Sequence, residues 1–283
     1  MPGHPAHDDY PEDVDMSLRR SIATIAIALA AFVTNGNHAR AEPGQVSAAE
    51  SPYPDVTGAQ WIKLEGAKGR KFLTAIFRPD GPGPFPVVVL LHGSDGLLKD
   101  YASIAQEVAR AGFLVVYGCW SAGYLGTSGN RLCSEATPAI EYGDDPAANS
   151  GEVLIAFART LPGARADRIG LYGLSFGGNA ALWAASTGAD VQAVVVDAPY
   201  VRFPEPLKVL PNLSAPVLLM QGTDDEWVPL GPTREYEKAA RDLGKPLVAV
   251  YFEGIGHVVS DQAKSRAEAR QRAIAFLRDQ LLK

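Results

Sequence analysis

This sequence of 283 residues is poor in the side chains that build metal and redox sites. It has two cysteines, Cys119 and Cys133, and five histidines, and three of those histidines (positions 4, 7 and 38) precede the part predicted to fold. Two remaining histidines and a single pair of cysteines argue against a zinc site. We therefore expect no bound metal.

The signatures of nucleic-acid and nucleotide binding are also missing. The 26 basic residues are outnumbered by 32 acidic ones, the formal net charge is −6, and no basic run is present. This argues against a nucleic-acid partner. There is neither a P-loop nor a G-x-G-x-x-G pattern, so no nucleotide cofactor is expected. No repeat with solenoid or propeller spacing occurs.

Long apolar runs are absent as well. The run Ile22–Val33 falls short of the roughly 20 residues of a membrane-spanning helix. It follows Met16 and the basic pair at 19–20 and precedes an A-x-A motif at 39–41, the order of a secretory signal peptide. Residues 1–41 are thus predicted to be a disordered leader and a signal peptide cleaved after Ala41. An uncleaved membrane anchor is the alternative.

Cleavage of such a signal predicts a periplasmic or secreted protein without stable membrane association. In that oxidising setting Cys119 and Cys133 are predicted to form a disulfide, because the segment between them is polar and glycine-rich. A loop of about fifteen residues closed in this way would stabilise the fold by roughly 3 kcal/mol in the chain-entropy model. Two free buried thiols are the alternative.

The rest of the chain reads as a flexible leader at 42–60, rich in Pro, Ser and Ala, and one domain at 61–283. Within the domain, strand patterns alternate with helix patterns, and the first two strands suggest an antiparallel hairpin at a sheet edge. Strands are predicted at 61–64, 71–77, 86–91, 113–117, 169–172, 191–196, 217–221 and 247–252, and helices at 101–111, 152–161, 176–185, 233–243 and 262–282. This alternation predicts the doubly wound α/β class, a mostly parallel sheet with helices on both faces. Ligands then bind at the carboxyl ends of the strands.

One stretch carries a catalytic motif. The strand-like run Ile169–Tyr172 leads into Gly173-Leu174-Ser175-Phe176-Gly177, and an alanine-rich helical segment follows. This is the G-x-S-x-G nucleophile elbow in its strand–turn–helix context. The turn is strained and projects the hydroxyl from the sheet, and glycines on both sides allow a close approach of strand and helix. Ser175 is the predicted nucleophile, and a chance match is the alternative.

A serine hydroxyl is a weak nucleophile and needs a histidine base. Only His92 and His257 lie in the predicted domain. His257 follows the last strand in a glycine-containing turn and is the predicted base, with a structural role as the alternative. His92 opens the loop after an apolar strand and is predicted to brace that loop.

The base needs a carboxylate that orients it, and we expect this acid after the strand at 217–221. The segment there offers three acids, of which we predict Asp225, with Asp224 as the next candidate. A solvated acidic loop without a catalytic role is the alternative. Asp197, after the strand at 191–196, is another geometrically sensible position, although a loop cap suits its Asp-Ala-Pro sequence better.

The glycine-containing loop that begins at His92 suits an oxyanion hole, since its backbone can approach a substrate carbonyl closely. The predicted donors are the N–H groups of Ser94 and Phe176, with Asp95 as a substitute for Ser94. Aromatic residues near the strand ends could line a substrate pocket, with ordinary loop packing as the alternative for each. These residues are Trp120, Tyr124, Tyr200 and Trp227.

Together these residues resemble the α/β-hydrolase superfamily and, within it, the dienelactone hydrolase-like group. Four segments carry the resemblance: LLHGSDG, GLSFGG, GTDDEWVP and GIGH. It covers roughly residues 86–283 and keeps the chain order Ser…Asp…His of the superfamily. The proline-rich segment between the strands at 191–196 and 217–221 has no long amphipathic helix, so we expect no large lid.

Dienelactone hydrolases carry a cysteine nucleophile, whereas this chain has Ser175, and the difference points to a more general ester hydrolase. The resemblance therefore implies a serine hydrolase of small or medium soluble carboxylic esters that works through an acyl-enzyme. The alternatives are a serine peptidase of the prolyl-oligopeptidase type and a non-enzymatic binding module on this scaffold. The sequence makes no prediction of oligomeric state.

Overall fold

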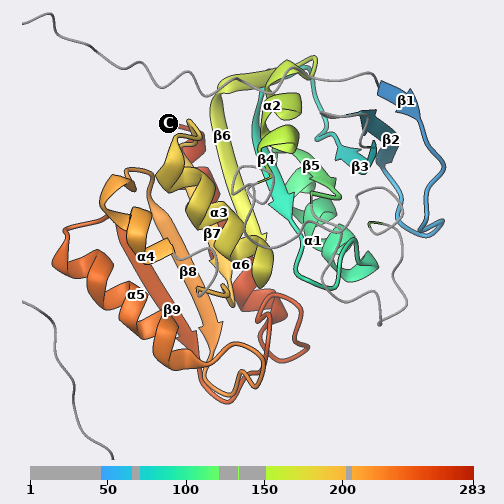
Figure 1. Cartoon of the computed structure of the whole chain (residues 1–283). Coiled ribbons are helices and arrows are strands. Elements are labelled where there is room, and N and C mark those ends of the chain that lie inside the picture. Colours follow the sequence, from blue (N-terminus) through green and yellow to red (C-terminus); the bar gives the residue numbers. More distant parts are fainter. Residues whose placement is uncertain (1–45, 66–70, 121–132, 134–150, 202–205) are drawn as a thin grey trace, which may run out of the picture. The chain divides into compact units, whose positions relative to one another are not determined.

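The computed structural model describes residues 46–65, 71–120, 133, 151–201 and 206–283, and all of them belong to one compact unit (Figure 1). Tyr124 and the predicted signal peptide lie outside these residues. Within the described part, no helix has the length and apolar character to cross a membrane.

A sheet of nine strands runs through the described part of the unit, in the order β1-β2-β3-β5-β4-β6-β7-β8-β9. The first three strands pair antiparallel, β3 pairs antiparallel with β5, and the strands from β5 to β9 are parallel neighbours. The bounds are β1 (Val46–Ala48), β2 (Ala59–Glu65), β3 (Lys71–Phe77), β4 (Phe85–Leu91), β5 (Leu114–Gly118), β6 (Ala164–Leu174), β7 (Ala193–Asp197), β8 (Val217–Gly222) and β9 (Leu247–Phe252). The predicted doubly wound α/β class is confirmed.

Helices cover both faces of the sheet, which explains why the central strands are apolar throughout. In β4, Val87, Val89 and Leu91 pack into the core on one face, and Val88 and Leu90 pack into the core on the other. The first face is covered by α2 (Glu152–Thr160), α3 (Phe176–Thr187) and α5 (Leu230–Asp242), and the second by α1 (Lys99–Arg110) and α6 (Arg266–Leu281). The short α4 (Pro206–Val209) and the 3-10 helix η2 (Leu210–Asn212) precede β8.

The chain reverses its direction of winding between β4 and β6. After β4 it crosses through α1 to β5 on one side, and after β6 it crosses through α3 to β7 on the other. Because α1 and α3 lie on opposite faces, the chain leaves the carboxyl ends of β4 and β6 in opposite directions. In open α/β sheets this switch point is where ligands bind. The predicted nucleophile and oxyanion loop both lie there.

The structure differs from the sequence prediction at several boundaries. Residues 46–48, predicted as part of a flexible leader, form β1 and pair with β2. Helix α5 begins at Leu230, so Pro232 falls inside its first turn, where a missing N–H costs no helical hydrogen bond. Helix α6 begins at Arg266 rather than at 262, because the preceding residues continue the loop that carries His257.

Candidate active site

Ser175 lies at the junction of β6 and α3 in a backbone conformation that few non-glycine residues adopt, with φ 52° and ψ −115°. Four backbone hydrogen bonds hold it there. Its N–H donates to the carbonyl of Asp197 at 2.8 Å. Its carbonyl accepts from the N–H groups of Gly178 (2.9 Å), Tyr200 (3.1 Å) and Asn179 (3.3 Å). The strained conformation is therefore fixed by its surroundings, as expected at a functional site.

Two glycines make this junction sterically possible. A Cβ on Gly173 would lie 2.2 Å from the carbonyl oxygen of Gly177, and a Cβ on Gly177 would lie 2.2 Å from that of Leu91. Any side chain at either position would push α3 away from β6 or from the end of β4. The glycines of the G-x-S-x-G motif thus serve the close approach that the motif predicts.

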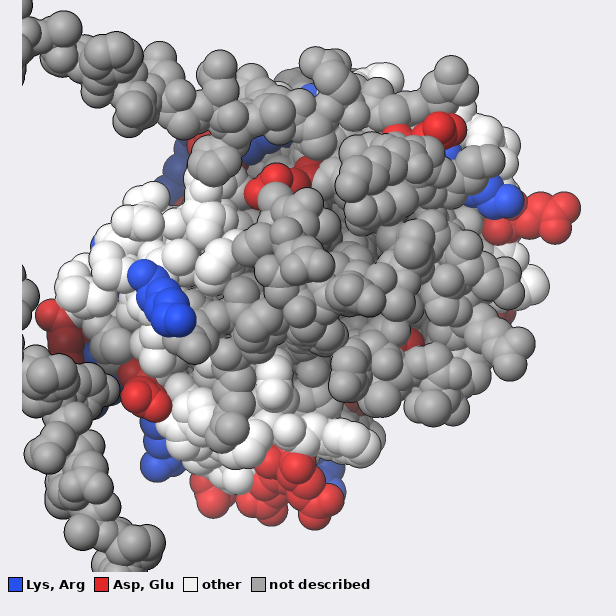
Figure 2. Space-filling view, in the orientation of Figure 1, with Lys and Arg blue, Asp and Glu red and all other residues white. Residues whose placement is uncertain are grey.

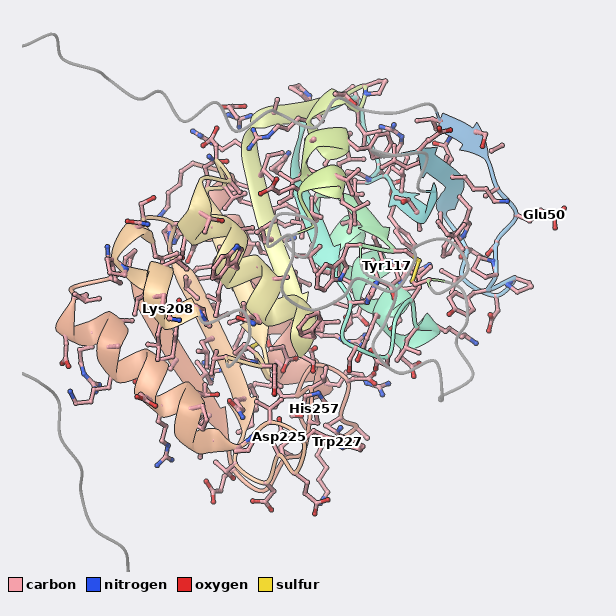
Figure 3. The ribbon with its side chains drawn as sticks, in the orientation of Figure 1. Glu50, Tyr117, Lys208, Asp225, Trp227 and His257 are labelled. Carbon is pink, nitrogen blue, oxygen red and sulfur yellow. A yellow bond between two sulfur atoms is a disulfide. The ribbon has the colours of Figure 1, made fainter. Side chains whose placement is uncertain are left out.

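Asp225 and His257, which follow β8 and β9, form the central polar contact of the site (Figure 3). The Nδ1 atom of His257 lies 2.8 Å from Oδ2 of Asp225. The other carboxylate oxygen, Oδ1, accepts the backbone N–H groups of Trp227 (3.0 Å) and Val228 (2.9 Å). The Asp225 side chain is fully covered, and that of His257 is 22% exposed. The carboxylate is thus fixed, and the imidazole still reaches solvent.

The electrostatics of this pair assign the imidazole proton. Burial by itself would raise the pKa of Asp225, but the hydrogen bonds from His257 and from the Val228 and Trp227 amides outweigh it and hold the pKa below its ordinary value. An ionised carboxylate only accepts hydrogen bonds, so Nδ1 of His257 is the donor. The neutral ring then presents Nε2 as an acceptor, the tautomer that a general base requires.

The two other candidate acids have different positions. Asp224 is exposed, and its backbone N–H donates to Ile255 at 3.0 Å. Asp197 is completely buried at the end of β7, and burial raises its pKa to about 6. Its carboxylate accepts the backbone N–H groups of Val259 (2.9 Å) and Ser260 (2.8 Å). Asp225 is therefore the acid hydrogen-bonded to His257.

These contacts also bring the histidine loop towards the elbow. β6, β7, β8 and β9 are consecutive neighbours, so their carboxyl ends lie in a row roughly 5 Å apart. The loop after β9 folds back over this row, since the residues just after His257 reach Asp197 at the end of β7. Asp197 in turn holds the N–H of Ser175. Ser175 and the loop that carries His257 thus share Asp197 as a neighbour.

The loop after β4, which is predicted to form the oxyanion hole, lies against the elbow. A Cβ on Gly93 would lie 3.3 Å from Cβ of Ser175, so the two segments are in contact. Ser94 is half-buried in this loop, and Phe176 is the first residue of α3. Beside them the Tyr101 hydroxyl donates to Asp95 at 2.8 Å, and burial raises the pKa of Asp95.

His92 occupies the position expected of a bracing residue. It is fully buried, and its Nδ1 lies 2.7 Å from the carbonyl of Gly93. Burial lowers its pKa to about 4. Its own carbonyl accepts the indole N–H of Trp120 at 3.1 Å, and its Nε2 lies 3.6 Å from the sulfur of Cys133. This buried ring holds the oxyanion loop against the disulfide.

The predicted disulfide is present, with Cys119 and Cys133 both buried and their Cα atoms 5.3 Å apart. It keeps Trp120 in the core, where the indole stacks on Phe176 at 5.4 Å between ring centroids. The prediction of Trp120 as a wall of an open pocket is therefore corrected. Trp120 is 1% exposed and packs against Phe176, the residue directly after Ser175. The sequence missed this because the neighbouring residues are polar and glycine-rich.

The other predicted pocket residues are placed differently. Tyr200 is half-buried, and its N–H holds the carbonyl of Ser175. Trp227, beside Asp225, is 75% exposed at the rim of the site. Acidic side chains gather over the ends of β8 and β9 at the lower edge of the view in Figure 2. The exposed acids of these two loops are Asp224, Glu226 and Glu253.

Sequence reasoning gave Asp197 a minor place and assigned the Asp95 side chain no role. The partners of Asp197 are backbone amides, which leave no trace in side-chain patterns. Among the described residues, no group of three or more histidine, cysteine, aspartate or glutamate side chains could hold a metal ion. The arrangement is suited to acyl transfer by a serine, a histidine and an aspartate.

Comparison with known proteins agrees with this geometry. The sequence profile of the dienelactone hydrolase family matches residues 72–281. The chain belongs to the dienelactone hydrolase family. A protein of Bradyrhizobium sp. named "Probable 2-oxo-3-(5-oxofuran-2-ylidene)propanoate lactonase" is 25% identical over 213 residues, which are 70% of this chain and 82% of the relative. Within this family, the chain is a carboxylic ester hydrolase.

Solved structures share the fold of this dienelactone hydrolase family member. A dienelactone hydrolase-like promiscuous phosphotriesterase from metagenomic libraries superposes with a TM-score of 0.65 at 17% identity, covering 78% of this chain and 98% of the other. The acylaminoacyl peptidase of Pyrococcus horikoshii gives 0.66 at 19% identity, covering 80% of this chain and 42% of the other. At these identities the likeness shows the α/β-hydrolase fold alone.

Proposed function

We propose that this family member is a serine hydrolase that cleaves carboxylic esters through an acyl-enzyme on Ser175. The observation that carries the proposal is the 2.8 Å contact between His257 Nδ1 and Asp225 Oδ2 at the strand ends next to the strained elbow. In a chain with His92 buried and committed to its own loop, His257 is the base available to the nucleophile. A serine in place of the cysteine of dienelactone hydrolases makes such a base essential.

The proposed reaction follows from these positions. His257 Nε2 takes the proton of the Ser175 hydroxyl as its oxygen attacks the ester carbonyl, and Asp225 stabilises the imidazolium that forms. The tetrahedral oxyanion accepts hydrogen bonds from the backbone N–H groups of Ser94 and Phe176. The proton then passes from His257 to the leaving alcohol, and the acyl-enzyme remains. Water, deprotonated by His257, hydrolyses that intermediate and frees Ser175.

We infer small or medium soluble esters as the substrate class. Between β7 and β8 the described elements are the short α4 and η2, without a long amphipathic helix of the kind that covers interfacial lipases. The exposed acids in the loops after β8 and β9 repel anionic substrates, so uncharged esters fit this rim best. The exposed indole of Trp227 offers an apolar surface beside the catalytic acid.

We also propose that the protein is exported and works in an oxidising compartment. The signal-like sequence at 16–41 and the buried pair Cys119–Cys133 support this proposal, since disulfides persist outside the reducing cytosol.

Replacing the nucleophile tests the proposed function. Purified protein is expected to hydrolyse p-nitrophenyl acetate, and Ser175→Ala is expected to lower kcat by about 10⁴- to 10⁶-fold. Ser103→Ala, an exposed serine of α1, serves as the matched control and should keep full activity. A fluorophosphonate probe should label the wild type and not Ser175→Ala.

The outcome also separates the alternatives. Retained activity in Ser175→Ala would remove the serine from the mechanism. Faster turnover of a peptide anilide than of the ester would favour a peptidase. An unlabelled, folded and inactive wild type would favour a binding module.

A further inference from the structure

Asp197 is a fully buried carboxylate that the reaction proposed above does not use. It ends β7, between the strand that leads to Ser175 and the strand that leads to Asp225. A buried carboxylate is costly unless hydrogen bonds satisfy it, and leaving it unpaired would destabilise the fold. The positions of its hydrogen-bond partners show which segments it holds in place.

Asp197 contacts both halves of the site at once. Its main-chain carbonyl accepts the N–H of Ser175 at 2.8 Å. Its carboxylate accepts the N–H of Val259 through Oδ1 at 2.9 Å and that of Ser260 through Oδ2 at 2.8 Å. One residue therefore links the nucleophile to the segment that begins two residues after His257.

The loop after β9, which carries His257, needs this link because its backbone is strained directly after His257. Val258 has φ 55°, which is an outlier for a β-branched side chain. Two further bonds stabilise the loop, from the Gln262 side chain to the His257 carbonyl (2.6 Å) and from the Ser265 hydroxyl to the Val259 carbonyl (2.7 Å). Both come from residues within the loop, whereas the Asp197 bonds connect it to β7.

The charged and titratable groups around Asp197 come from several elements. Tyr172 faces it from β6, Tyr101 from α1 and His257 from the loop itself. Arg270 of α6 donates to the Ser260 carbonyl at 2.7 Å and pairs with Glu107 of α1. Asp197 is therefore enclosed by side chains from β6, α1 and the loop after β9.

We propose that Asp197 is a positioning residue that sets the place of the His257 imidazole relative to the Ser175 hydroxyl. It does so by holding the two backbone segments that carry these residues. The proposal rests on the ester hydrolase function given above. Asp197 touches neither substrate nor reacting atoms, and its effect passes through His257.

Two substitutions in the full chain test this role. Asp197→Asn keeps the size of the side chain but leaves one carbonyl oxygen for two amide donors, and its NH₂ group faces an N–H. Ser265→Ala is the matched control, because it removes another buried hydrogen bond of the same loop and leaves the Asp197 link intact. The measurements are kcat and KM for p-nitrophenyl acetate, the fraction of protein labelled by a fluorophosphonate at completion, and hydrogen exchange of the segment 253–265.

For Asp197→Asn we expect kcat to fall about 10- to 100-fold with KM within about twofold, since misplacement by about 1 Å has effects of this size. The fraction of protein that a fluorophosphonate labels at completion should stay that of the wild type, because the nucleophile is intact in every folded molecule. Exchange in 253–265 should rise about tenfold or more. Ser265→Ala should keep kcat within about threefold.

Several results would overturn the proposal. These are a kcat of Asp197→Asn within about threefold of the wild type, an equal loss in Ser265→Ala, or a labelled fraction that falls in step with kcat, which would indicate only an inactive fraction. If the wild type neither hydrolyses esters nor accepts a fluorophosphonate, the proposed function fails separately. Hydrogen exchange is then the only measurement that tests the positioning role. A larger rise in the exchange of 253–265 in Asp197→Asn than in Ser265→Ala supports the role, and the absence of such a rise overturns it.

Discussion

The Asp225 carboxylate is fixed before any substrate arrives. Two backbone amides, from Trp227 and Val228, bind one of its oxygens, and His257 binds the other. Because the amides belong to the turn directly after Asp225, the turn itself holds the carboxylate in place. The carboxylate that orients His257 is therefore held in place by the loop after β8.

Asp225→Asn should lower kcat by about 10⁴-fold at neutral pH, because the asparagine amide can hold His257 in the wrong tautomer while the geometry stays intact. KM should change little. Asp224→Asn, at the exposed neighbouring acid, is the control and should retain activity within about threefold. Steady-state kinetics on p-nitrophenyl acetate measure both variants. Equal losses in the two would show that the general charge of the loop matters more than the bond to His257.

His92 should make the fold acid-sensitive. Its pKa is about 4 in the folded protein and about 6.5 in the unfolded chain. As the pH falls from 6.5 to 4, the unfolded chain takes up a proton that the folded protein does not. This lowers the free energy of unfolding by up to about 3 kcal/mol. The stabilisation is thus complete above pH 6.5 and lost as the pH falls through 4.

Denaturant unfolding at pH 7 and pH 4.5 measures this effect, and the loss should be smaller in His92→Asn than in the wild type. Asp197 acts with the opposite sign, because its raised pKa favours the folded state between pH 6 and 4. The difference between wild type and His92→Asn removes this contribution, which both proteins share. An equal loss in both would contradict the depressed pKa of His92.

At the level of single residues, the catalytic candidates could be predicted because few residues compete for each role. Two histidines remained in the domain, and one of them belonged to the oxyanion loop. The choice between Asp224 and Asp225 needed the backbone turn, which orients one carboxylate towards His257 and leaves the other in solvent. The burial of Trp120 could not be predicted, because its packing partner Phe176 lies far away in the sequence.

Among the elements, the disulfide lies between the end of β5 and the loop after β4. Cys119 follows β5 directly, and Cys133 lies against His92, which follows β4. The bond therefore supports both the oxyanion loop and the stacking of Trp120 on Phe176. The disulfide stabilises the fold in two ways. It restricts the conformations of the unfolded chain, and it holds this cluster of side chains together.

Replacing both cysteines by serine should lower the free energy of unfolding by about 3 kcal/mol. Chemical unfolding of the variant and of the oxidised wild type, both without reductant, measures the difference. Titration of thiols in the unreduced, denatured wild type supplies the control, and it should find no free thiol. Two free thiols would show that the bond does not form in the purified protein.

Strand β1 shows why the sequence could not predict the edge of the sheet. It has three residues, all exposed, which is too short for a recognisable alternation of apolar and polar side chains. It forms because β2 offers free backbone groups, and Val46, Ser47 and Ala48 pair with them. The central strands, in contrast, are uniformly apolar because helices cover both of their faces, and the sequence predicts them well.

For the unit as a whole, the alternation of strands and helices was enough to predict a mostly parallel sheet. That prediction in turn placed Ser175, Asp225 and His257 at one edge, since each of them follows a parallel strand. The sequence could not give the fold-back of the loop after β9. Its course depends on the buried bonds to Asp197, which form only when β7 is already in place.

The beginning of the folded unit can be tested by truncation. β1 lies at one edge of the sheet and β9 at the other, and in Figure 3 Glu50 is far from Asp225 and His257. A chain that starts at Glu42, as cleavage after Ala41 would produce, keeps β1. It should match the full chain in Tm and in kcat/KM. A chain that starts at Ser51 loses β1, together with the hydrogen bond from the Ala49 N–H to the Trp61 carbonyl.

The chain that starts at Ser51 should be less stable by roughly 1–2 kcal/mol, since the lost edge pairing contributes a few hydrogen bonds. For a domain of this size, that corresponds to a Tm lower by about 2–8 °C. Its kcat/KM should stay within about twofold, because the site lies across the sheet from the lost strand. Thermal unfolding and ester hydrolysis of the three chains measure both effects. An unchanged Tm would mean that β1 contributes nothing to stability, and a large loss of kcat/KM would mean that the edge of the sheet communicates with the site.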